Sequence, residues 1–178
     1  MKFLYTMLSV VWLIYGWVCY QAMQWEPPYP IPWHAARDLQ KTNPTKLQKD
    51  METYRLYLNM EDLTTFQRTN TLFNLAICHW LTAYLQDSRQ KQVAYLKMSL
   101  KECRDALAIV PDSAHFTYCI ADLYHQMQEY EKAEHYYIEA ISAAPDESLY
   151  RQRYHEMLDE RAEKRAEENL PDATSATP

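Results

Sequence analysis

Four polar or aromatic side chains share one face of a single expected helix. His115, Tyr118, Asp122 and His125 are spaced by three, four and three residues, which places them along one side of an α-helix. Imidazole, phenol and carboxylate groups in a row offer hydrogen-bonding points to a peptide. The same row is compatible with a solvated helix face, or with burial beneath a neighbouring helix. We expect a partner-binding groove and leave both alternatives open.

These side chains do not suit a metal site. Zinc ligands must converge on one point, whereas residues seven or ten apart on a helix lie about 10 to 15 Å apart along its axis. His115 and Cys119, four residues apart, have better geometry, but a small buried cysteine is the commoner role. We predict no metal ligand and no cofactor.

The sequence contains no convincing catalytic constellation. The HExxH pattern of metalloproteases is absent because Asp159 follows His155-Glu156 where the second histidine would stand. Gly16 is the single glycine, so glycine-rich phosphate loops are excluded. We predict a protein that is not an enzyme and takes no small-molecule substrate.

Composition excludes further classes of protein. The chain has 178 residues, 18 Lys and Arg against 24 Asp and Glu, and a formal net charge of −6. Nucleic-acid capture needs a basic excess, so we expect no nucleic-acid partner. No alternating strand pattern occurs, and the scarcity of glycine disfavours a β fold with many tight turns. The expected fold class is all-α.

The first 25 residues predict a transmembrane anchor. Residues 3–25 carry no charge, and the stretch 3–20 alone reaches the roughly 18 residues that mark a spanning candidate. The alternative is a cleaved signal peptide, which needs small residues at its −3 and −1 sites. Cleavage after Ala22 would place Tyr20 at −3, so a retained anchor in contact with the bilayer is favoured.

Charges beside the expected span give only a weak orientation. Lys2 lies on one side of it, and Arg37 and Lys41 lie on the other. We prefer a cytoplasmic N-terminus, which places the C-terminal domain in the periplasm of a bacterium. Ser9 and Gly16 share a helix face and would let another membrane helix approach, although a single glycine in a span usually has no such role.

Residues 26–42 form a proline-rich juxtamembrane linker, because four prolines between positions 27 and 32 favour an extended spacer. Residues 43–170 form the helical domain. Asn43-Pro44 begins its first helix, a second runs over about 60–84, and Ser88 caps a third. A helix with a capping role follows Pro145, and residues 171–178 form a disordered tail.

Comparing the chain with itself reveals a period of 34 residues, which is typical of a helical repeat. Ala106-Leu107 corresponds to Ala140-Ile141, and Pro111-Asp112 corresponds to Pro145-Asp146. The segment 114–147 resembles a tetratricopeptide repeat (TPR). The resemblance rests on Ile120, Ala121, Tyr124, Tyr130, Ala133, Tyr137, Ala140 and Pro145, which stand at the family's characteristic positions.

The segment departs from the TPR consensus at two places, and a degenerate repeat precedes it. The turn 126–129 lacks the usual glycine, and Thr117 replaces the family's first tryptophan. A preceding unit between Phe73 and Pro111 is about eleven residues too long, which longer helices or an extended turn must absorb. The resemblance implies antiparallel helical hairpins in a short α-solenoid.

Together these patterns predict a membrane-anchored adaptor or structural subunit that contacts protein subunits of a membrane complex. The alternative is a periplasmic or secreted TPR-type assembly chaperone, released by cleavage and binding clients transiently. A disulfide between Cys103 and Cys119 stays open, because reduced core thiols explain both residues equally well.

Overall fold

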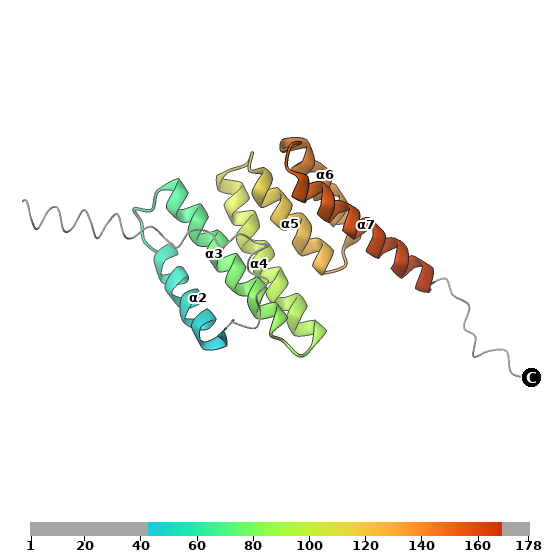
Figure 1. Cartoon of the computed structure of the whole chain (residues 1–178). Coiled ribbons are helices and arrows are strands. Elements are labelled where there is room, and N and C mark those ends of the chain that lie inside the picture. The colour runs from blue at the N-terminus through green and yellow to red at the C-terminus, as the bar shows by residue number, and fades with distance from the viewer. Residues whose placement is uncertain (1–42, 169–178) are drawn as a thin grey trace, which may run out of the picture. The chain divides into compact units, whose positions relative to one another are not determined.

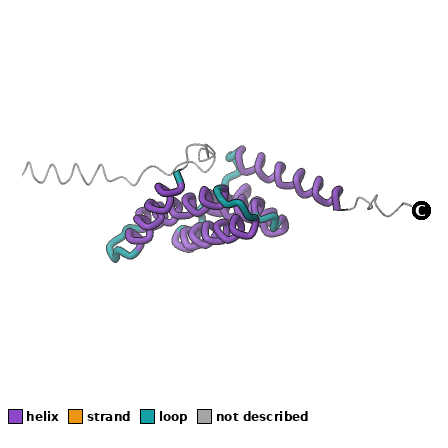
Figure 2. Tube along the Cα trace, turned by 90° about the horizontal axis from the view of Figure 1, so that it is seen from below, coloured by secondary structure: helices purple, strands orange, loops and turns teal. Residues whose placement is uncertain are grey.

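The computed structural model describes residues 43–168, which belong to one compact unit of the chain (Figure 1). Within this range there are six α-helices and no strand, so the all-α prediction is confirmed there (Figure 2). The helices are α2 Pro44–Leu58, α3 Thr65–Tyr84, α4 Arg89–Ile109, α5 Ala114–Gln126, α6 Tyr130–Ala143 and α7 Ser148–Glu168.

Several predictions fall outside these residues. The transmembrane anchor at 1–25 with Ser9 and Gly16, the linker at 26–42 and the tail at 171–178 are not described by the structure. Across the described stretch, 43–168, none of the helices combines the length and the apolar character needed to cross a bilayer.

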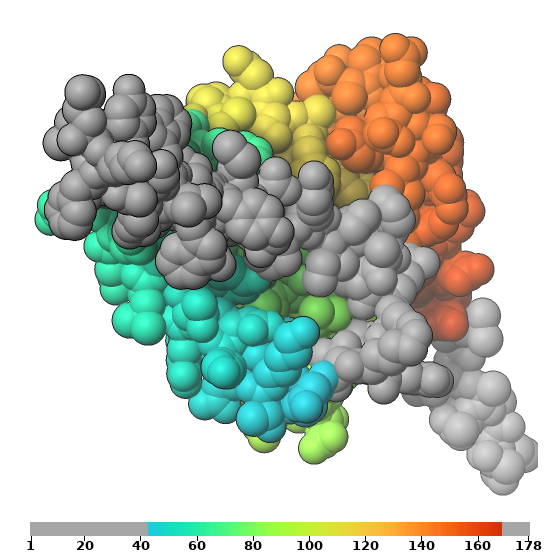
Figure 3. All heavy atoms as spheres, turned by 60° about the vertical axis from the view of Figure 1, so that its left-hand side comes forward, coloured from blue at the N-terminus to red at the C-terminus, as the bar shows by residue number. Residues whose placement is uncertain are grey.

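The helices stack side by side in chain order, from α2 to α7 (Figure 1). The most extensive contacts join α3 to α4 and α5 to α6, while α4 also packs on α5. α2 covers α3, and α7 covers α6 with a smaller contact to α5. Figure 3 shows α2 in cyan and α6 in orange at opposite edges of the described residues. The architecture is a short solenoid-like bundle built from contacts between neighbours.

Helix starts follow capping chemistry. The Asn43 side chain accepts a 3.0 Å hydrogen bond from the Thr45 amide, and Ser88 caps α4 as predicted. α3 begins at Thr65 and not near residue 60, which corrects the predicted start. Thr64 and Gln67 form a capping box that fixes this start, so the preceding residues remain a loop.

The excess length of the earlier unit is absorbed by longer helices. α3 and α4 have 20 and 21 residues, whereas α5 and α6 have 13 and 14. Both helices of the first pair are therefore about two turns longer than their counterparts.

Small residues bring α5 and α6 together. Ala121, Ala133 and Ala140 are fully buried, and the large Tyr137 side chain is fully buried beside them. Alanine at these positions lets the two helix backbones approach, and aromatic rings fill the remaining space.

The turn between α5 and α6 is a Schellman motif. The Glu129 amide donates to the Tyr124 carbonyl at 2.9 Å, and the Gln128 amide donates to the His125 carbonyl at 2.8 Å. This geometry places Gln128 at φ 64°, in the left-handed region where glycine is preferred. The missing glycine noted in the sequence is therefore replaced by a glutamine in an unfavourable conformation.

Replacing Gln128 with glycine should stabilise the domain. We expect Gln128→Gly to raise the free energy of unfolding by about 0.5–1 kcal/mol, because the steric cost of the left-handed backbone disappears. The hydrogen bond that Gln128 accepts from Lys164 is solvent-exposed and contributes little. Urea unfolding of the full chain measures the difference.

The matched control is Gln152→Gly on the exposed face of α7. There the same substitution should lower the free energy of unfolding by about 1 kcal/mol, as glycine does inside helices. Destabilisation by both substitutions would contradict the role assigned to the φ of Gln128.

Candidate functional site: a buried polar network between α5 and α7

The structure places the predicted groove row largely beneath α7. Tyr118, Asp122 and His125 are 3%, 2% and 6% exposed, whereas His115 at the start of α5 is exposed. The Tyr118 ring stacks on Tyr150 of α7, with ring centroids 4.5 Å apart. In this conformation three of the four residues are therefore covered by a neighbouring helix of the same chain and do not form an open groove.

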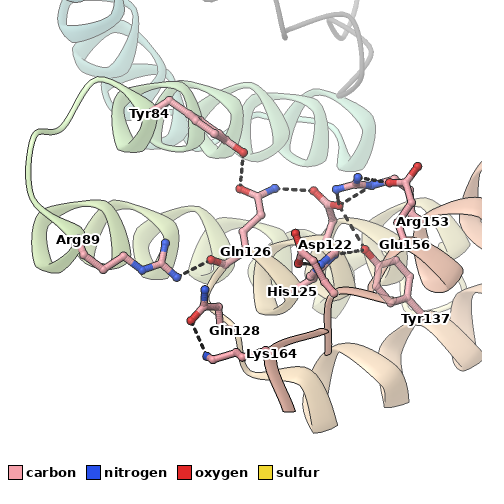
Figure 4. Close-up of polar contacts among 11 residues, drawn as sticks. Tyr84, Arg89, Asp122, His125, Gln126, Gln128, Tyr137, Arg153, Glu156 and Lys164 are labelled. Carbon is pink, nitrogen blue, oxygen red and sulfur yellow. Dashed lines mark hydrogen bonds and ion pairs between the residues drawn. The ribbon is translucent and has the colours of Figure 1, made fainter. Parts of the chain in front are cut away.

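Asp122 is the centre of the polar contacts (Figure 4). Its Oδ1 accepts hydrogen bonds from Nη2 and Nε of Arg153 on α7, at 2.5 and 3.0 Å. Tyr137 of α6 donates to the same oxygen at 3.2 Å, and Gln126 donates to Oδ2 at 2.6 Å. A buried carboxylate is tolerated only with such partners, and here both oxygens are satisfied.

His125 extends the network toward the end of α7. Its Nε2 lies 2.6 Å from Oε2 of Glu160, and its Nδ1 lies 3.4 Å from the Tyr137 hydroxyl. Because Tyr137 also contacts Asp122, the Arg153–Asp122 ion pair and the Glu160–His125 contact meet at one phenol. His125 of α5 thus contacts both α6 and α7.

Gln126 connects this centre to the first helix pair. Its Oε1 accepts hydrogen bonds from Trp80 Nε1 at 2.8 Å and from the Tyr84 hydroxyl at 2.9 Å. Arg89 at the start of α4 donates to the Gln126 carbonyl at 2.7 Å, as Figure 4 also shows. The network therefore links all five helices from α3 to α7.

The environment keeps the phenols of this network protonated. Burial, followed by the nearby Asp122 carboxylate, raises the pKa of both Tyr118 and Tyr137 above the ordinary value for tyrosine. Burial also raises the pKa of Tyr150 to about 12. At neutral pH these groups serve as hydrogen-bonding and packing groups that hold α7 in place.

The His115–Cys119 pair lies at a contact distance, with Nε2 and Sγ 3.8 Å apart. Three or more His, Cys, Asp or Glu side chains arranged to hold a metal are not found among residues 43–168. Cys78, Cys103 and Cys119 are buried free thiols, and burial raises the pKa of Cys78 to about 12. Buried thiols with a raised pKa are poor nucleophiles.

Sequence reasoning missed Arg153 and Gln126. Arg153 lies three residues after Tyr150 and four before Met157, which are both buried, so helical spacing already put a cation on the inner stripe of α7. Such a cation requires an acidic partner, and Asp122 was the acid on the facing helix. The role of Gln126 had no comparable signal in the sequence. Its side chain and carbonyl accept hydrogen bonds from α3 and α4, and these contacts depend on how the three helices cross.

A second cluster, between α2, α3 and α4, was also missed. Nδ1 of His79 lies 3.2 Å from Oε2 of Glu102, and Nη2 of Arg55 lies 3.3 Å from Nε2 of His79. His79 and Glu102 are both buried. A charged residue on an otherwise apolar stripe of α4 was the signal in this case.

Comparisons with known proteins add no assignment: no protein-family model, curated protein or solved structure matches this chain.

Removing the charge of Asp122 should destabilise the domain strongly. We expect Asp122→Asn to lower the free energy of unfolding by about 3 kcal/mol, because it removes the buried counter-charge of Arg153 and leaves only the pair with the exposed Glu156. Denaturant unfolding followed by circular dichroism measures the loss.

The matched control is Asp105→Asn, which breaks the exposed pair with Lys101. An exposed pair at this helical spacing contributes about 0.5 kcal/mol or less. Equal losses for the two variants would show that the Asp122–Arg153 pair has no special weight.

Alkaline pH should weaken the domain from about pH 10 upward. Tyrosines of the unfolded chain ionise near pH 10, whereas Tyr118, Tyr137 and Tyr150 keep their protons in the folded state. Their contribution is fully present below pH 10 and is lost as pH rises through the folded-state pKa values. Urea midpoints between pH 8 and 12, with phenolate absorbance at about 295 nm, follow this loss.

Tyr150→Phe removes one of these phenols and should make the fall in stability with pH less steep. An unchanged slope in the Tyr150→Phe variant would contradict the assignment for this residue.

Proposed function

We propose that the chain is a membrane-anchored, TPR-like adaptor or structural subunit of a membrane-associated multiprotein complex. The observation that carries this proposal is the stack of consecutive helix pairs, in which every element from α2 to α7 packs chiefly on its neighbours in chain order. Helical stacks of this kind present long side surfaces to other polypeptides.

The TPR assignment is part of the proposal and draws support from packing. α5 and α6 coincide with the segment 114–147 that resembles the repeat, and the expected small residues Ala121, Ala133 and Ala140 are fully buried between them. We assign α3 and α4 to the degenerate unit.

Both ends of the stack are closed by polar helices. α2 has one buried residue, Leu47, and α7 has two, Tyr150 and Met157. End helices that bury little and expose charge are typical of caps, so further repeats are not needed at either end. We place partner contacts on the sides of the stack.

The row on α5 is retained as a partner site with one added condition. A partner that contacts Tyr118, Asp122 and His125 must displace α7, because α7 covers these side chains. His115 lies at the exposed end of the row, where contact requires no such displacement.

The proposed anchor at residues 3–25 gives modest contacts a biological effect. Confinement to one membrane raises the effective concentration of the domain near other membrane subunits. We place the anchor in a bacterial inner membrane and the helical domain in the periplasm.

Purification of the intact protein from its native membrane in mild detergent tests this function. We expect the full-length chain, with Met1 or residue 2 at its N-terminus by mass analysis, to co-purify with defined membrane subunits in a fixed ratio. A variant that lacks residues 3–25 is the control and should lose both membrane retention and these subunits. A mature soluble chain that begins after residue 22 and binds clients transiently would instead support the assembly chaperone.

A further inference from the structure

A groove of about 600 Å³ lies between α2, α3 and α4, away from the Asp122 network. Its walls combine apolar and polar side chains. Leu58, Leu72 and Ile109 contribute apolar surface, and charged groups of both signs line much of the remaining wall. Pockets of a few hundred cubic ångströms with apolar walls and a few convergent polar groups are typical ligand sites.

Three cations from three different helices line this groove. Arg55 belongs to α2, Arg68 to α3 and Lys101 to α4. They converge in a chain whose net charge is −6, so the groove differs in sign from the molecule as a whole. The fold, and not the local sequence, brings these cations together.

The two guanidinium groups retain unused donors. A guanidinium has five N–H donors. Arg55 contacts only Nε2 of His79 at 3.3 Å, and Arg68 donates to the Leu58 and Met60 carbonyls at 3.4 Å each, among residues 43–168. These contacts are at the long end of hydrogen-bonding distances, so the N–H donors of both guanidinium groups are poorly satisfied.

The acidic residues at the groove are already engaged. Glu102 lies 3.2 Å from Nδ1 of His79, and Asp105 lies 2.8 Å from Nζ of Lys101. Neither carboxylate forms an ion pair with Arg55 or Arg68. Because Lys101 and Asp105 neutralise each other, the excess of donors in the groove comes from the two guanidinium groups, and such an excess is the pattern of an anion site.

We propose that the groove between α2, α3 and α4 binds a phosphate monoester with an apolar substituent, held by Arg55 and Arg68. A phosphate group offers three terminal oxygens and up to two negative charges, enough for two guanidinium forks, whereas one fork satisfies a carboxylate. The apolar walls accept the organic part of the ester. The same chemistry occurs in lipids whose headgroup is a phosphate monoester, such as phosphatidic acid, and in soluble phosphate monoesters.

The site does not depend on the adaptor role proposed above. Arg55 exchanges its long contact with His79 for a charge-assisted one, and His79 remains held by Glu102. Ligand binding therefore requires no rearrangement of the buried pair.

Calorimetric titration of the full chain in a non-ionic detergent tests the proposal, with inorganic phosphate, n-butyl phosphate and butyrate as probes. We expect n-butyl phosphate to bind about tenfold more tightly than inorganic phosphate, since part of the butyl group becomes buried. Butyrate should bind more weakly than n-butyl phosphate. Equal binding of n-butyl and inorganic phosphate would overturn the role assigned to the apolar walls and, with it, the proposed ester.

The double variant Arg55→Gln/Arg68→Gln should weaken n-butyl phosphate binding at least about tenfold. The charge-matched control is Lys46→Gln/Lys91→Gln, which changes exposed lysines that do not line the groove. Arg55→Lys/Arg68→Lys keeps the charge without the forks and should also bind weakly. Thermal melts confirm that each variant is folded.

Three results would overturn the proposal: no measurable binding of either phosphate, unchanged affinity in the Arg55→Gln/Arg68→Gln variant, or an equal loss in the lysine control. Full binding by the Arg55→Lys/Arg68→Lys variant would reduce the site to general charge attraction and would overturn the assigned geometry.

Discussion

The requirement to satisfy one buried carboxylate organises the C-terminal half of the domain. Asp122 is 2% exposed, and a charge at such depth is stable only with a close counter-charge and full hydrogen bonding. Arg153 supplies the charge, and Tyr137 and Gln126 supply the remaining donors. Tyr137 belongs to α6 and Arg153 to α7, so their bonds to the carboxylate on α5 restrict how these three helices meet.

This arrangement explains how α7 is held although it buries few apolar side chains. Tyr150 and Met157 are its only buried residues within the described part, while Arg161 adds ion pairs to Glu131 and Glu134. The stabilisation from a buried ion pair depends on the exact positions of its groups, so such pairs tolerate substitution poorly. The stabilisation from apolar contacts depends mainly on the surface area that they bury. The last helix is therefore positioned specifically and held with modest apolar burial, which suits an element that covers a candidate binding face.

The parts of the fold that sequence could predict are those with a local physical cause. Asn43-Pro44 and Ser88 mark helix starts through capping, and the alanines at 121, 133 and 140 mark the close approach of α5 and α6. The start of α3 was misplaced because its apolar pattern extends upstream of the Thr64 cap. The burial of the α5 row stayed one of several alternatives, because the sequence pattern places Arg153 on the inner stripe of α7 but does not say that this stripe covers α5, 31 residues away.

The unequal lengths of the two helix pairs give the stack a direction. The Phe73 ring of α3 contacts the His115 and Phe116 rings at the start of α5, with ring centroids 5.0 and 5.9 Å away, and Trp80 donates to Gln126 at the end of α5. α3 extends eight residues, or roughly 12 Å, before Phe73 but only four residues beyond Trp80. Repeats of equal length would be related by a simple translation along the stack, and the extra residues of α3 break this relation. A linear polypeptide laid along the stack would meet a larger step at one end than at the other, so its two orientations would differ in energy.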